Sequence, residues 1–110
     1  MIAYLSDGSQ AGYERELERY LALLAIEEAS LVRAWGANDR VSVSKTAHRL
    51  MGHFHMVNAS APADAAGELE IAAGEAAADL DLRVRRLCQL AETLGAVLRQ
   101  GAAGSGIANP

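Results

Sequence analysis

The chain has 110 residues, which is enough for one domain with a hydrophobic core and too few for two. Aromatic residues make up only 5% of it and there are two prolines, a composition typical of an all-α protein. The net charge of −4 argues against nucleic acid as a partner, and no apolar run approaches the roughly 20 residues that cross a bilayer. We therefore expect a cytoplasmic helical domain with no nucleic acid bound and no direct membrane contact.

The first half of the chain predicts two long helices. Residues 1–5 are short and apolar, and we expect either the end of a short helix or a strap across the other helices. A first long helix is predicted over 10–35, with Gly36 as its left-handed cap and Asn38 or Asp39 capping the next helix. The second helix is predicted over 40–57, where apolar residues recur at alternating steps of four and three: Val43, Ala47, Leu50, Phe54 and Val57.

The second half predicts two more helices. Ser60 is expected to cap a third over 61–78, and Asp79 or Asp81 a fourth over 82–100. Their predicted buried faces consist of Ala65, Leu69, Ala73, Ala76, Val84, Leu87, Ala91, Leu94 and Leu98. Residues 101–110 show no apolar periodicity and are predicted to be a flexible tail. Since short connections favour antiparallel neighbours, residues 1–100 predict an antiparallel up-down-up-down four-helix bundle.

All three histidines lie in the second predicted helix. His48 is expected to point well to one side of the buried seam, near solvent, and Gly52 follows one turn later on the same face. A glycine inside a helix costs roughly 1 kcal/mol relative to alanine, and its missing side chain would uncover the imidazole for a large partner. His53 and His55 face different directions, and we interpret both as surface residues.

The sequence predicts no metal site, no disulfide and no catalytic motif apart from the histidine segment. Helical zinc sites favour histidine pairs at i and i+4, and the chain has none, so we expect no bound metal. Cys88 is the single cysteine, which excludes an internal disulfide framework, and it is interpreted as a small buried filler. Nucleophile elbows, phosphate-binding glycine loops and dinucleotide fingerprints are also missing, so an autonomous catalytic site or a bound cofactor is not expected.

The segment Ala47-His48-Arg49-Leu50-Met51-Gly52 resembles the Ala-His-x-Leu-Lys-Gly motif of the histidine-containing phosphotransfer (Hpt) family, and Leu69-Glu70 follows at the family's spacing. The resemblance spans about residues 12–100. It implies a phosphocarrier in which His48 accepts a phosphoryl group from the aspartate of a receiver domain and passes it to a response-regulator aspartate. Magnesium would belong to the receiver. The resemblance further suggests a monomeric module, either free-standing or at the end of a hybrid sensor histidine kinase.

The resemblance also assigns roles around His48. Where the family has a lysine that steadies the phosphoryl group, this chain has Met51. Lys45, three residues before His48 on the same face, is expected to supply the missing charge, with Arg49 ranked below it because it diverges around the helix. The resemblance implies that Gly52 gives the phosphoryl group room and that the partner docks on a surface made of Met51, His55 and Met56.

Two other interpretations stay open at this point. The chain could be a helical interaction or dimerisation module in which His48 has no chemistry, and this predicts a defined oligomer at low concentration. It could also be a bundle that binds a small ligand or a metal. The phosphorelay interpretation differs from both because it predicts a phosphoryl label that is labile in acid and stable in base.

Overall fold

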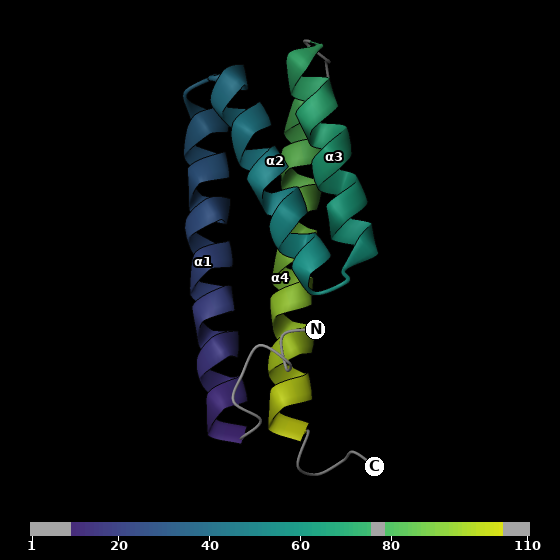
Figure 1. Ribbon diagram of the computed structural model, residues 1–110. Coiled ribbons are helices and arrows are strands. Elements are labelled where there is room, and N and C mark those ends of the chain that lie inside the picture. The colour runs from purple at the N-terminus through teal and green to yellow at the C-terminus, as the bar shows by residue number, and fades with distance from the viewer. Residues whose placement is uncertain (1–9, 76–78, 105–110) are drawn as a thin grey trace.

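Four α-helices make up the computed structural model, which describes residues 10–75 and 79–104. They are α1 (Gln10–Gly36), α2 (Arg40–Met56), α3 (Ser60–Gly74) and α4 (Leu80–Gly104). In Figure 1 the chain runs up α1, down α2, up α3 and down α4, and the longer α1 and α4 extend beyond the loop that joins α2 to α3. Both α1 and α3 pack against α2 and α4. The predicted all-α four-helix bundle is confirmed.

The core is filled from all four helices. Its largest fully buried side chains are Phe54, Leu31, Leu50, Leu69, Leu80, Leu87 and Val43. The apolar seam predicted for α2 is buried along its whole length. The start of α2 has weak intrinsic helix preference, and packing of Val43 in the core holds it in place. The Ser44 hydroxyl adds a hydrogen bond to the backbone oxygen of Glu70, 3.3 Å away, which ties α2 to α3.

The turn between α1 and α2 differs from the prediction in one detail. Gly36 is still helical, and the left-handed residue is Asn38, with a φ of 56°. Asparagine tolerates this conformation because its short polar side chain can hydrogen-bond locally. Asp39 then caps α2: its Oδ1 accepts from the backbone nitrogen of Ser42 at 3.1 Å, and its Oδ2 accepts from the Ser42 hydroxyl at 2.7 Å. Of the two predicted caps, the structure selects Asp39.

The ends of α3 and α4 also differ from the sequence-based boundaries. Ser60 is not the cap of α3 but its first residue; Ala59 precedes it and accepts from Ala63 through its backbone oxygen at 3.1 Å. The helix ends at Gly74, earlier than predicted, and residues 76–78 lie outside the described part of the chain. Helix α4 continues to Gly104, into the predicted tail, while residues 105–110 and the predicted strap at 1–5 lie outside the described ranges.

A pair of carboxyl groups lies where α1 packs on α4. Glu28 and Glu92 line a hollow of about 110 Å³ between the two helices. Burial, together with a hydrogen bond to Glu92, raises the pKa of Glu28 from 4.5 to about 7. Cys88 is half-buried, and burial raises the pKa of its thiol to about 11 with help from the two carboxylates. The raised pKa lowers the fraction of thiolate at neutral pH. The side chain is half-buried, and not fully buried as the sequence predicts.

The carboxyl pair should make stability depend on pH near neutrality. Between about pH 4.5 and 7 the folded chain holds a proton on Glu28 that the unfolded chain has lost, so stability falls as the pH rises through this window. We expect Glu28→Gln to reduce the difference in unfolding free energy between pH 5 and pH 8 by about 1 kcal/mol, a value discounted because the group is partly exposed. Urea unfolding at both pH values measures it. Glu18→Gln, at an exposed acid, is the control. If both variants reduced the pH-dependent difference in unfolding free energy equally, the raised pKa of Glu28 would be contradicted.

Candidate functional site

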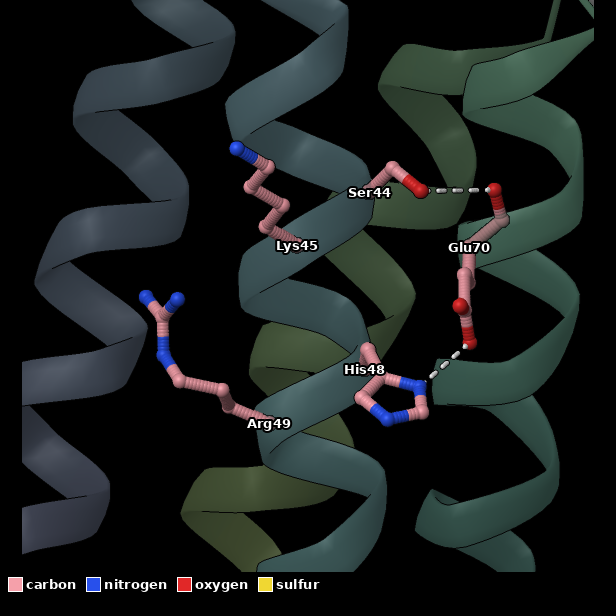
Figure 2. A pocket seen from close by; sticks show the side chains of 5 residues that line it. All are labelled: Ser44, Lys45, His48, Arg49 and Glu70. Atoms are coloured by element: carbon pink, nitrogen blue, oxygen red, sulfur yellow. Dashed lines mark hydrogen bonds and ion pairs between the residues drawn. The ribbon is translucent and has the colours of Figure 1, made fainter.

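His48 projects from the outer side of α2 into an open hollow of about 390 Å³. The hollow is lined by Ser44, Lys45, His48, Arg49 and Glu70 (Figure 2). The His48 side chain is 65% exposed, as its position beside the buried seam predicts. Side chains one or two positions apart on a helix point in different directions. Ala47 and Leu50 therefore stay in the core while the imidazole of His48 reaches the surface.

Glu70 of α3 holds the imidazole ring of His48 in one orientation. Its Oε1 lies 3.2 Å from the Nδ1 of His48, and Figure 2 shows the ring turned toward this carboxylate. Because an ionised carboxylate can only accept a hydrogen bond, the bond places the proton on Nδ1. The other ring nitrogen, Nε2, then carries the free electron pair, on the side of the ring away from Glu70. The contact with Glu70 therefore favours the tautomer with the proton on Nδ1 and leaves Nε2 exposed.

Gly52 has no role in the packing of the bundle. A Cβ atom built at this position would meet no atom of another side chain or helix within 4 Å. The residue lies in the middle of a regular helix, so neither its backbone conformation nor its neighbours require glycine. The helix nevertheless bears the cost of a glycine, roughly 1 kcal/mol relative to alanine. Packing within the described part of the chain therefore gives no reason for a glycine at this position.

Arg49 is engaged elsewhere. Its Nε donates to both carboxylate oxygens of Glu27 on α1, at 3.1 and 2.9 Å, and its Nη2 donates to the hydroxyl of Thr46 at 3.2 Å. Glu27 is buried, and the hydrogen bond from Arg49 holds the pKa of its carboxyl below the ordinary value. The sequence predicts that Arg49 supports His48. Its contacts favour a different role, because the guanidinium links α2 to α1.

His53 belongs to the same interface, and its interpretation as a surface residue is wrong. Its side chain is only 20% exposed, and its Nε2 lies 3.7 Å from Oε2 of Glu27. The backbone oxygen of His53 also accepts the hydroxyl of Tyr20 at 2.8 Å, and burial raises the pKa of that hydroxyl to about 12. The sequence held a signal for this cluster: Arg49 and His53 are four residues apart on one face of α2, and Glu27 is an acid within an apolar stretch of α1.

The other predicted site residues lie at different distances from the hollow. Lys45 is exposed and lines it, but Figure 2 shows its ammonium group pointing away from the imidazole of His48. Met51 is half-buried against α3, with its sulfur 3.3 Å from the position of a Cβ added to Gly67. His55 is exposed and Met56 is 50% exposed, so both are accessible to a partner that covers the end of α2.

Other kinds of site find no support in the described ranges. Over residues 10–75 and 79–104, no group of three or more histidine, cysteine, aspartate and glutamate side chains is placed to hold a metal ion. None of the helices in those ranges is long and apolar enough to span a membrane.

No protein-family model, curated protein or solved structure matches the chain. The resemblance to the Hpt family accordingly rests on the residues of this chain alone. The motif residues His48 and Glu70 lie on the neighbouring helices α2 and α3, with the imidazole and the carboxylate 3.2 Å apart.

Proposed function

We propose that the chain is a phosphocarrier of a multistep phosphorelay, in which His48 takes a phosphoryl group from a receiver-domain aspartate and delivers it to a response-regulator aspartate. The observation that supports this most directly is the exposed imidazole of His48 with its Nδ1 hydrogen-bonded to Glu70. A nucleophile that must meet an aspartyl phosphate in another protein has to lie at the surface with a defined free nitrogen. Nε2 of His48 meets both conditions.

The proposed reaction forms one bond and breaks one. The electron pair on Nε2 attacks phosphorus, the bond between phosphorus and the aspartyl oxygen of the donor breaks, and the donor aspartate leaves as a carboxylate. Nδ1 keeps its proton throughout, so the ring gains a positive charge that the carboxylate of Glu70 offsets at 3.2 Å. Return to a second receiver aspartate reverses these steps. Transfer of this kind depends on positioning and charge stabilisation, so the carrier needs no acid–base pair of its own.

The partner supplies the remaining groups in this proposal. Magnesium and the acceptor or donor aspartate belong to the receiver domain, as the family resemblance implies. The chain contributes His48, the clearance at Gly52 and a surface for docking that includes His55 and Met56. It is proposed to work either as a free-standing carrier or as a module of a hybrid sensor histidine kinase, in the cytoplasm.

Phosphoryl transfer from labelled receivers tests the function. The chain is incubated with magnesium and a panel of receiver domains charged with radioactive phosphate, and the labelled chain is divided between acid and base. We expect a label that is lost in acid and stable in base, because an N–P bond behaves in this way and a phosphoserine does not. Failure of every receiver in the panel to label the chain, or an acid-stable label, would contradict the proposal.

Gly52→Ala should separate stability from transfer. We expect the free energy of unfolding to rise by about 1 kcal/mol, because the added methyl group meets no other atom and alanine favours the helix. The same methyl group should slow transfer from a receiver that closes on His48 over this position. Gly101→Ala, at an exposed glycine of α4 with equally open surroundings, is the matched control and should leave transfer unchanged. Equal transfer rates for both variants would refute the clearance role.

Lys45→Ala tests whether this residue replaces the charge missing at Met51. The ammonium group points away from His48, but an exposed lysine has four rotatable bonds and lies one turn from the imidazole. We expect the half-life of the phosphohistidine to fall about 1.4- to five-fold, the size of an exposed charge interaction of roughly 0.2–1 kcal/mol. Lys45→Arg should keep most of the half-life. Identical half-lives for the parent and Lys45→Ala would eliminate the role.

A further inference from the structure

The outer face of α1 is apolar over about three turns. Between residues 20 and 32 every exposed side chain is apolar: Ala22, Leu23, Ala25, Ile26, Ala29 and Val32. The larger ones are well exposed, with Ile26 at 62% and Val32 at 54%. The two acids of this stretch, Glu27 and Glu28, are turned inward to α2 and α4. The helix is thus apolar on its outer side as well as on its core side.

Such a face is unusual for a helix at the surface of a bundle, where the outer side ordinarily carries charged and polar residues. The exposed side of α4 does so, with Arg85, Arg86, Gln89 and Glu92 among its members. On α1, by contrast, Ala22, Ala25, Ala29 and Val32 are separated by three, four and three residues, the spacing of a stripe that packs on another helix. The alanines allow a close approach of the two backbones.

The charges at the two ends of the stripe favour a second copy of α1 as the helix that packs on it. The exposed charges that flank the stripe are Glu18 and Arg19 at its start and Arg33 at its end, and Arg19 already pairs with Glu16 on its own helix at 3.4 Å. An antiparallel copy of α1, related by a two-fold axis between Ala25 and Ile26, puts Glu18 of each copy opposite Arg33 of the other. A parallel copy would put like charges opposite each other.

We propose that the chain forms a homodimer through the outer face of α1, with the two α1 helices antiparallel. In this arrangement Ala22 lies opposite Ala29 of the second copy, and Ile26 packs beside Ala25, each contact occurring twice as two-fold symmetry requires. The dimer departs from the monomer expected on the family resemblance. It is weak, since one helix pair buries less than the roughly 1,200–2,000 Å² of a standard interface.

Dimerisation through α1 leaves the candidate phosphorelay site open. His48 lies on α2, turned toward α3 and Glu70, whereas the stripe lies on the side of α1 away from the core. The dimer does not rest on the proposed function, because molecular mass measures it whether or not His48 takes label. It would give a relay two independent carrier sites in one particle.

Sedimentation equilibrium of the full chain from about 5 to 500 μM tests the dimer. We expect the mass to rise with concentration from 11.6 kDa toward twice that value. Ile26→Lys should weaken association at least ten-fold, because it removes the central apolar contact and brings two positive charges together at the axis. Leu82→Lys changes an equally exposed residue of α4, 68% exposed, and should have no effect. Circular dichroism confirms that both variants fold.

Charge reversal tests the antiparallel arrangement. Arg33→Glu should weaken association by placing two acids opposite each other, and the double variant with Glu18→Arg should restore it. A mass of one chain at all concentrations overturns the proposal, as does equal weakening by Ile26→Lys and Leu82→Lys, which would locate the contact elsewhere. A dimer that Arg33→Glu leaves unchanged overturns the antiparallel pairing of the two helices.

Discussion

His48→Gln is expected to abolish the acid-labile label on this chain completely. Glutamine has a side chain of similar size and can still hydrogen-bond to Glu70, but its amide nitrogen is not a nucleophile toward phosphorus. The imidazole is 65% exposed, so the replacement should change the free energy of unfolding by no more than about 0.5 kcal/mol. Loss of label would then show that the imidazole accepts the phosphoryl group, and not that the variant has failed to fold. Autoradiography after acid and base treatment of each variant measures it.

His55→Gln is the matched control. His55 is exposed on nearly the same face of α2 two turns later, so it shares the helix, the solvent and the docking surface of His48 but not its contact with Glu70. We expect it to accept the acid-labile label, at a rate lowered by its loss from the docking surface. Equal labelling of parent and His48→Gln would show that His48 is not the acceptor. Loss of label in His55→Gln alone would show that His55 is the acceptor.

The helix that carries His48 could be predicted because its information is local. The seam from Val43 to Val57 follows the period of an α-helix, and the same period puts His48 and Gly52 on the exposed side. The capping aspartate is equally local, since the Asp39 carboxylate reaches a backbone nitrogen three residues ahead. Patterns that repeat within one helix do not depend on how the helices pack against each other. The structure therefore agrees with what these patterns predict.

Contacts between helices could not be predicted in the same way. The distance from His48 to Glu70 depends on the rotation of α3 about its axis, and one residue of rotation, about 100°, would turn the carboxylate away. Glu27, on a different helix from Arg49, presents the same problem. The left-handed residue of the α1–α2 turn differs from the prediction for another reason. Glycine tolerates a positive φ best, yet Asn38 adopts it because Gly36 still lies within α1.

Arg49→Met is expected to destabilise the bundle by about 2–3 kcal/mol. Methionine keeps the length and packing of the arginine stem but leaves the buried carboxylate of Glu27 with the imidazole of His53, at 3.7 Å, as its nearest basic group. Removing one partner of a fully buried ion pair costs about 3–5 kcal/mol; the lower value here reflects the 49% exposure of the Arg49 side chain. Urea unfolding at pH 7 measures the loss.

A double-mutant cycle with Glu27→Gln shows whether the loss arises from the ion pair. In the double variant no buried charge remains, so we expect it to be more stable than Arg49→Met alone, with a coupling energy of about 1–2 kcal/mol. The pKa of Glu27 is lowered in the folded chain, so the stabilisation by the pair is present at neutral pH and lost as the pH falls through the folded pKa. Arg49→Met should therefore cost much less at pH 3 than at pH 7. An equal cost at both values would contradict the ion pair as the source of the loss. Glu27 would then contribute little to holding α2, which carries His48, against α1.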